Sequence, residues 1–156
     1  MIHAAEVPAV IRTKLTGYAS ITTLPVQWGD QDAFGHVNNI VYFRWFESSR
    51  IDFLEALHTQ VSMKGTGIGP ILAAINCEFR RQLRFPDTVY VGSKVTRVGR
   101  SSADIAHAVV SREQGEIVAE GKSVVVIFNY EAQRVTRIPE ELRKQFELSV
   151  HNPNPG

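Results

Sequence analysis

The sequence predicts an α+β domain in which a curved antiparallel sheet wraps around one long central helix. The chain has 156 residues, of which 44% are hydrophobic, enough for one core but not for two comfortable domains. Residues 39–57 have helical periodicity, and four runs rich in Val, Ile and aromatic residues follow them. Consecutive strands joined by short turns favour antiparallel pairing, and the helix needs an apolar sheet to cover its aromatic face.

The remaining boundaries follow from local signals. A first strand is expected at residues 18–28, where Pro25 suggests an edge position or a bulge. Asn38 is the expected N-cap of the helix, which leaves the backbone N–H groups of residues 39–41 without intrahelical partners. The later elements are expected at residues 71–83, 88–99, 102–113 and 116–130 for the strands and at about 139–148 for a closing helix.

Composition limits the domain organisation and the partners. We expect one domain over residues 17–148, with flexible tails at 1–16 and 149–156. The 17 Lys and Arg residues nearly balance the 16 Asp and Glu residues, so there is no broad basic surface for nucleic acid. The single cysteine, Cys77, excludes an intramolecular disulfide and favours a reducing, cytoplasmic location. No apolar run reaches the length of a membrane span, so we expect no membrane partner.

Polar residues are concentrated in the stretch WGDQDAFGHVNN, between the first strand and the helix. It begins like a calcium-binding loop, but Phe34 and Val41 occupy places where oxygen ligands belong. A transition-metal site made from Asp30, Asp32 and His36 lacks a further ligand nearby. We therefore expect no metal.

After these exclusions, the candidate chemical feature is an acidic residue placed just before the start of the helix. The sequence has no nucleophile elbow or P-loop, the glycines at 65–70 lack dinucleotide spacing, and Cys77 lies in an alternating strand typical of a buried thiol. A helix N-terminus offers free N–H donors that polarise a carbonyl, and Asp32 lies a few residues before them. Asp32 is therefore a candidate general base or nucleophile for acyl transfer to water, although an aspartate here also caps turns.

The same residues resemble a known family. The pattern D-x-D-x-x-G-H-V-N-N-x-x-Y, which starts at Asp30, resembles the signature of hotdog-fold acyl-CoA thioesterases of the 4-hydroxybenzoyl-CoA thioesterase type. Residues 79–105 are similar to a strand pair of that family, and residues 115–129 are similar to its last strand segments. The resemblance implies a hotdog fold, an acyl-CoA substrate, no cofactor, and a homodimer or homotetramer with active sites at the subunit interface.

The resemblance also assigns roles to single positions. It implies that Asp32 is the catalytic acid, that the Asn39 amide polarises the thioester carbonyl, and that Gly35 makes the close turn. Arg100 and Ser101 match a turn that meets the nucleotide phosphates of coenzyme A in relatives, whereas the family's arginines on the final strand are missing here and leave a lysine, Lys122, as a weak candidate.

Phe34 separates the chain from relatives that act on acyl carrier protein. Those thioesterases share H-V-N-N but have a functional asparagine at this position, so Phe34 favours acyl-CoA and an Asp-centred mechanism. An acyl-carrier-protein thioesterase, a non-catalytic acyl-CoA-binding protein and an acyl-CoA dehydratase are the alternatives. The acyl group itself is not determined by the sequence.

Several roles stay open. His36 either positions water, bonds across a dimer or satisfies buried backbone groups. Tyr42 and Asn38 are candidate substrate contacts, although Tyr42 is also typical of core and Asn38 of a cap. Glu47 is a possible second catalytic carboxylate. The arginines of the RRQLR segment either form a solvated strand face or bind phosphate.

Overall fold

The expected order of strand, long helix and four further strands is present in the computed structural model, which describes residues 7–57 and 59–151. Three elements were not expected: α1, the 3-10 turn η2 and β6. The elements are α1 Ala9–Lys14, β1 Ser20–Pro25, η2 Trp28–Asp30, α2 Asn39–Ala56, β2 Ile68–Phe79, β3 Thr88–Val98, β4 Ser102–Ser111, β5 Ile117–Asn129, β6 Arg134–Val135 and α3 Glu140–His151.

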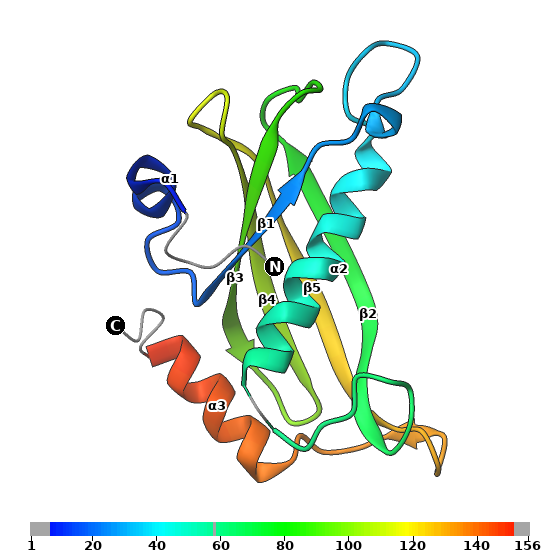
Figure 1. Cartoon of the computed structure of the whole chain (residues 1–156). Coiled ribbons are helices and arrows are strands. Elements are labelled where there is room, and N and C mark those ends of the chain that lie inside the picture. The colour runs from blue at the N-terminus through cyan, green and yellow to red at the C-terminus, as the bar shows by residue number, and fades with distance from the viewer. Residues whose placement is uncertain (1–6, 58, 152–156) are drawn as a thin grey trace.

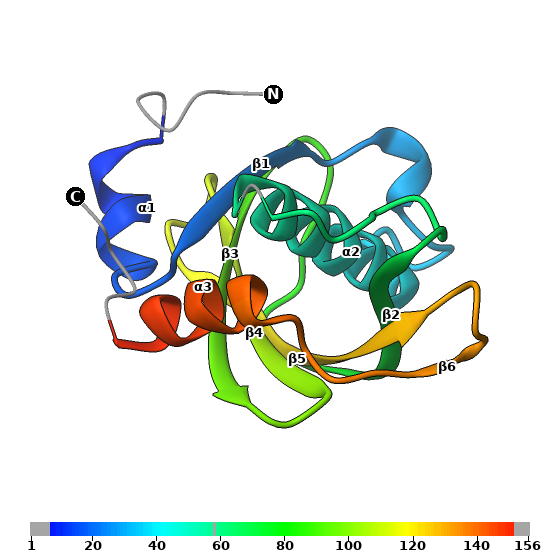
Figure 2. The same ribbon diagram turned by 90° about the horizontal axis from the view of Figure 1, so that it is seen from below.

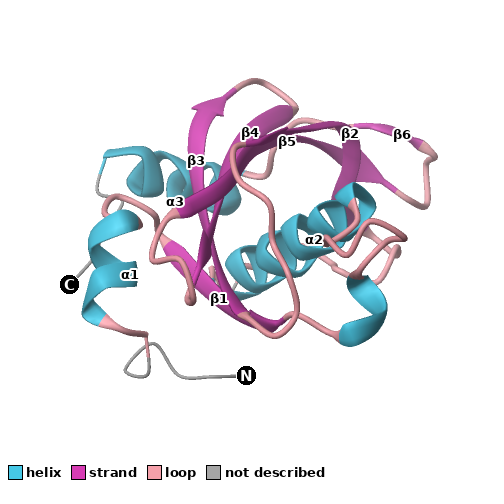
Figure 3. Cartoon of the chain, turned by 90° about the horizontal axis from the view of Figure 1, so that it is seen from above, coloured by secondary structure: helices cyan, strands magenta, loops and turns pink. Residues whose placement is uncertain are grey.

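The strands form one antiparallel sheet in the order β1-β3-β4-β5-β2, with β6 paired to β5. This sheet curls around α2, so that the first and last strands of the order, β1 and β2, lie on either side of the helix (Figures 1, 2 and 3). The prediction of a curved antiparallel sheet around one central helix is therefore confirmed.

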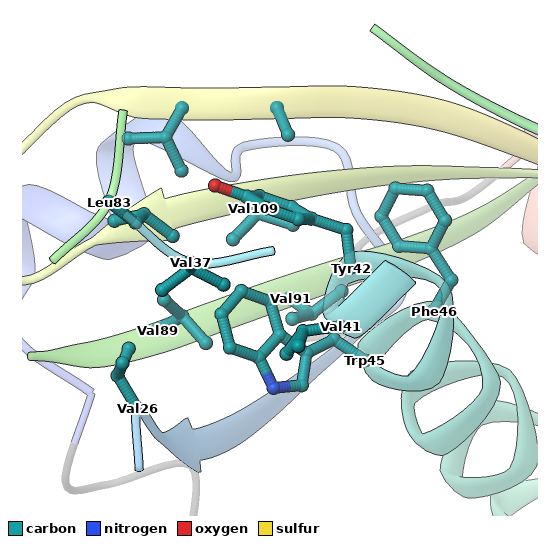
Figure 4. Packing of buried hydrophobic residues seen from close by; sticks show 12 residues of the cluster. Val26, Val37, Val41, Tyr42, Trp45, Phe46, Leu83, Val89, Val91 and Val109 are labelled. Carbon is teal, nitrogen blue, oxygen red and sulfur yellow. The ribbon is translucent and has the colours of Figure 1, made fainter. Parts of the chain in front are cut away.

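The aromatic face of α2 lies against the concave side of the sheet, as its periodicity predicts. Tyr42, Trp45 and Phe46 are at most 5% exposed and pack with Val89 and Val91 of β3 (Figure 4). Burial of large apolar side chains of this kind contributes roughly 1.5–3 kcal/mol each. This packing fixes the direction in which the helix start points.

A short helix covers the convex side of the sheet. α1 buries Ile11 and Leu15 against Tyr90 and Val110, which alternate with the inward-facing residues of β3 and β4. The expectation of a flexible segment over residues 1–16 therefore does not hold for the helical part, because an i, i+4 apolar pair anchors it. Residues 1–6 lie outside the described part of the chain.

The closing helix α3 packs beneath the far end of α2. Leu142 and Phe146 of α3, with Ile138 just before it, are buried in one cluster with Phe53 and Leu54 of the central helix. The observed start of α3 agrees with the expected one, but the helix continues to His151, past the predicted end at residue 148. The expected C-terminal tail therefore begins inside this helix, and its residues 152–156 lie outside the described part.

A buried polar layer separates this far core from the core under the first half of α2. Arg50 Nη1 donates to Ser123 Oγ at 3.0 Å, and Ser123 Oγ lies 2.8 Å from His107 Nε2. His107 Nδ1 lies 2.9 Å from Ser93 Oγ, which in turn lies 2.5 Å from Ser49 Oγ. All five side chains are buried.

The donor directions in this layer are determined by its two ends. Arg50 can only donate, so the Ser123 hydroxyl is free to donate to His107 Nε2. At the other end Ser49 donates to the Val91 carbonyl, so Ser93 donates to Ser49 and accepts from His107 Nδ1–H. His107 is therefore neutral with its proton on Nδ1, and burial lowers its pKa to about 3.

Candidate active site

The candidate site begins with a tight connection between β1 and α2. The carboxylate of Asp30 accepts from the Gln27 N–H at 2.8 Å and from Arg44 Nη2 at 3.1 Å. The Asp30 carbonyl accepts from the Asn38 N–H at 2.9 Å. Asp30, which is 6% exposed, thus ties the connection to the helix and has a structural role.

Asp32 lies at the start of a turn that holds its carboxylate at the surface. Its Oδ1 accepts from the Phe34 N–H at 2.8 Å, and its own N–H donates to the His36 carbonyl at 2.8 Å. Gly35, whose φ of +78° favours glycine, closes the turn by donating to the Asp32 carbonyl at 3.1 Å. The turn-capping role of Asp32 is thus present, and it uses Oδ1; within the described chain Oδ2 has no hydrogen bond.

The helix start leaves one donor free rather than three. Asn38 is the N-cap, as expected: its Oδ1 accepts from the Ile40 N–H at 3.0 Å, and its carbonyl accepts from the Val41 N–H at 3.0 Å. The prediction of three free amides is therefore wrong for Ile40 and Val41. Among the described residues, nothing accepts from the Asn39 N–H.

The acid and the free amide line one cavity of about 360 Å³. Six of its lining residues were singled out from the sequence: Asp32, His36, Asn39 and Tyr42 in the motif, and Arg80 and Arg81 as possible phosphate contacts. The others are Val37, Phe79, Gln82 and Leu83. Residues 80–83 follow β2 directly, and nothing in the sequence indicated that this segment faces the Asp32 turn.

His36 is bonded to an arginine. Arg84 Nη2 lies 3.2 Å from His36 Nε2, and a guanidinium has no acceptor. His36 Nε2 therefore accepts this bond, which places the proton of the neutral ring on Nδ1. This bond is not one of the three roles left open for His36, and those roles stay predictions; the Arg84 guanidinium orients the imidazole ring.

Tyr42, which lines the cavity, and Cys77, which lies near Tyr42, are both protonated. Burial raises the pKa of the Tyr42 hydroxyl above its ordinary value, so Tyr42 stays neutral. Burial also raises the pKa of the Cys77 thiol to about 11, and the nearby Glu78 acts in the same direction. A thiol in this state is a poor nucleophile, which agrees with the expectation of a structural cysteine.

The proposed coenzyme A contacts lie at the opposite end of the sheet within one chain. The Asp32 turn follows Pro25, which pairs with Thr88 at the start of β3, whereas Arg100 and Ser101 come after the end of β3 (Figure 1). Lys122 is engaged by Asp104, with 3.5 Å between Nζ and Oδ2. A single chain therefore does not bring these side chains to the cavity.

Metal binding and membrane crossing are two further possibilities for the part of the chain that the structure describes. No three His, Cys, Asp or Glu side chains there are grouped to hold a metal ion. No helix over the same residues is long and apolar enough to cross a membrane.

The fold and the cavity define a class of protein. An antiparallel sheet curled around a central helix is the arrangement of the hotdog fold. The chain belongs to the thioesterase-like superfamily, whose family model matches residues 26–146. The resemblance noted from the Asp30–Tyr42 motif is thereby confirmed.

Relatives agree with this family. The long-chain acyl-CoA thioesterase FadM of Escherichia coli is 25% identical over 129 residues, which cover 83% of this chain and 98% of FadM. The chloroplastic acyl-acyl carrier protein thioesterase ATL3 of Arabidopsis thaliana is 25% identical over 126 residues, covering 79% of this chain and 65% of ATL3. A thioesterase superfamily structure from Jannaschia has a TM-score of 0.81 at 26% identity and covers 93% of both chains.

Proposed function

We propose that the protein is an acyl-CoA thioesterase that hydrolyses its substrate to a free acid and coenzyme A. The observation that carries this proposal is the single cavity that contains both the Asp32 carboxylate and the unpaired Asn39 N–H. An acid that activates a nucleophile and a donor that stabilises an oxyanion are the two groups that acyl transfer to water requires.

The reaction follows from these two groups. In the general-base route, Asp32 takes a proton from water while the water oxygen attacks the thioester carbon. The carbonyl oxygen becomes an oxyanion and accepts from the Asn39 N–H at the positive end of α2. The C–S bond then breaks, and the proton passes from Asp32 to the departing sulfur. In the nucleophilic route, an Asp32 carboxylate oxygen attacks the carbon, and the C–S bond breaks to release the thiolate of coenzyme A, which takes a proton from water. Water then hydrolyses the anhydride to the free acid and the Asp32 carboxylate.

Neighbouring residues place these groups. Gly35 permits the turn that holds Asp32, and Asn38 fixes the first turn of α2 without using the Asn39 amide. His36, held by Arg84, lines the cavity and is proposed to orient water or the thioester. Tyr42 supplies an apolar ring surface for the acyl group.

Coenzyme A is the proposed carrier, and acyl carrier protein is the second candidate. FadM supports the first and ATL3 the second, since each is 25% identical to this chain. Phe34, which is 84% exposed, stands where acyl-carrier-protein thioesterases have a functional asparagine, and this favours coenzyme A. A cytoplasmic location and a homodimer or homotetramer, with Arg100 and Ser101 reaching coenzyme A from another copy, complete the proposal.

A thiol-release assay tests the proposed activity. Purified protein is incubated with short, long-chain and aromatic acyl-CoAs, and with the matching acyl groups on acyl carrier protein. We expect free coenzyme A from at least one acyl-CoA and slower release from the matched carrier protein. Tight acyl-CoA binding without thiol release, or hydration of an enoyl-CoA in its place, contradicts the proposal.

A further inference from the structure

The turn between β3 and β4 has its backbone acceptors occupied while several of its donors are free. Arg143 Nη2 donates to the carbonyl oxygens of Gly99 and Arg100, at 3.0 Å each. The Arg100 carbonyl also accepts from the Ile138 N–H at 3.0 Å, and the Ser101 carbonyl accepts from a backbone N–H of β5 at 2.8 Å. Among the described residues, nothing accepts from the N–H groups of Arg100 and Ser101 or from the Ser101 hydroxyl.

Two arginines border this turn, and only one of them is paired with an acid. Arg97 Nη2 donates to Asp104 Oδ1 at 2.9 Å. Arg100 is exposed, and no carboxylate oxygen of the described side chains lies within 4.0 Å of its guanidinium. A free guanidinium beside free N–H donors suits a phosphate, because each donor can form a charge-assisted bond and the occupied carbonyl oxygens are directed elsewhere.

Arg143 reaches the turn from α3, which lies beside the end of β3 (Figures 1 and 2). Its half-buried side chain uses one nitrogen, Nη2, for both carbonyl bonds. Its Nε is buried and has no hydrogen-bond partner within the described chain. A buried donor without a partner lowers stability, so Arg143 contributes less to folding than its two bonds suggest.

Peptide geometry links the two carbonyls held by Arg143 to the two free donors. In a planar trans peptide, the C=O of one residue and the N–H of the next residue point in opposite directions. The Gly99 carbonyl shares a peptide unit with the Arg100 N–H, and the Arg100 carbonyl shares one with the Ser101 N–H. Because Arg143 holds both carbonyls toward its own side chain, it directs both free N–H groups away from α3.

We infer that Arg143 is a positioning residue for the nucleotide end of coenzyme A. It orients the N–H groups of Arg100 and Ser101 so that they donate, together with the Arg100 guanidinium, to a phosphate. The inference rests on the proposed function, in which Arg100 and Ser101 reach coenzyme A bound to another copy, and it adds a residue that does not touch the ligand. The nucleotide phosphates carry the charge that these donors select, whereas the pantetheine arm is uncharged.

The test compares two thioesters with the same acyl group. One is an acyl-CoA that the wild type hydrolyses, and the other is its N-acetylcysteamine analogue, which keeps the thioester but lacks the nucleotide. In Arg143→Met, which has no donors, we expect KM for the acyl-CoA to rise at least about fivefold with kcat within about twofold of wild type, and no change with the analogue.

Two variants on α3 serve as controls. Arg143→Lys keeps N–H donors, so its KM for the acyl-CoA should lie closer to wild type than to Arg143→Met. Lys144→Met removes a neighbouring exposed charge and should leave KM for the acyl-CoA within about twofold of wild type. An equal rise of KM with both thioesters in Arg143→Met, or a rise as large in Lys144→Met, would overturn the inference.

Coupling to Arg100 shows whether Arg143 acts through the turn. Arg100→Ala should raise KM for the acyl-CoA alone, and Arg100→Ala/Arg143→Met should give less than the product of the two single effects. Multiplicative effects would contradict a positioning role. If Arg100→Ala raised KM and Arg143→Met did not, the inference would be wrong and the proposed function would stand. If the wild type hydrolysed no acyl-CoA, the proposed function would fail, and calorimetric binding of coenzyme A would replace KM in the same comparison.

A second measurement covers the case in which Arg143→Met does not fold. Adenosine 3′,5′-bisphosphate, the nucleotide end of coenzyme A, is titrated into isotopically labelled wild type while the backbone amide resonances are followed by NMR. We expect the N–H resonances of Arg100 and Ser101 to shift, and that of Gly115, in the turn between β4 and β5, to stay in place. Saturating nucleotide that leaves the Arg100 and Ser101 resonances unmoved overturns the inference.

Discussion

Acidification should destabilise the protein through His107 in a defined pH window. The His107 pKa falls from 6.5 to about 3 in the folded chain, because burial disfavours the imidazolium and the Arg50 charge adds to this effect. The unfolded chain therefore binds one more proton than the folded chain between these two pH values. The stability contributed by the neutral histidine is complete above pH 6.5 and is lost progressively as the pH falls toward 3.

The magnitude follows from one proton. Each pH unit below 6.5 removes about 1.4 kcal/mol from the free energy of unfolding, so about 3 kcal/mol is lost between pH 6.5 and 4.5. The lowered pKa values of Asp104 and Glu116 change the stability mainly below pH 4.5, which leaves His107 as the main contributor in that interval. The loss in the free energy of unfolding should level off near pH 3, at about 5 kcal/mol.

Urea unfolding at fixed chain concentration measures this slope, since the stability of an oligomer depends on concentration. The matched variant is His107→Asn, whose amide N–H can replace the bond to Ser93 but does not titrate. It should be less stable than wild type at pH 7.5 and nearly independent of pH from 6.5 to 4.5. An equal loss in both proteins over this window would refute the assignment of the slope to His107.

Three further predictions concern Asn38, Gly35 and Cys77. Asn38→Ala should lower the free energy of unfolding by about 1 kcal/mol, because it removes the side-chain oxygen that accepts from the Ile40 N–H. Asn38→Asp keeps such an oxygen and should stay near wild type. Equal urea midpoints for the two variants would contradict this. Gly35→Ala and Gly115→Ala should each lower the free energy of unfolding by about 1 kcal/mol, because both glycines have positive φ. Only Gly35→Ala should also reduce kcat, and equal kcat values in the two variants would contradict a role for the Asp32 turn. Cys77→Ser should leave kcat unchanged in a thiol-release assay, and a large loss would contradict a structural thiol.

The central helix was predicted accurately because its signals are local. Asn38 caps it as expected, and the observed end at Ala56 lies one residue before the predicted one. The sheet followed from the alternation of apolar residues in consecutive strands. α1 was not predicted. Ile11 and Leu15 have the i, i+4 spacing of one helical face, but three polar residues separate them and the pattern is too short to indicate a helix.

The candidate site was predictable in part. Asp32, Gly35 and Asn39 lie close in the chain, and their motif is specific. The buried polar layer of Arg50, Ser123 and His107 was not predictable from the sequence. Arg50 and Ser123 are 73 residues apart, and only the pairing of β5 with β4 in the folded sheet places Ser123 beside His107. Likewise, nothing near His36 in the sequence indicated its bond to Arg84, which is 48 residues away.

The most direct test of the account is the rate of thioester hydrolysis in Asp32→Asn. The amide keeps an oxygen to accept from the Phe34 N–H, so the turn should persist, but it cannot act as a base or nucleophile. We expect kcat for acyl-CoA to fall at least about a hundredfold. Oligomeric state and thermal unfolding should match wild type, and the exposed control Glu113→Gln should keep full activity. Hydrolysis by folded Asp32→Asn at the wild-type rate would contradict the central claim.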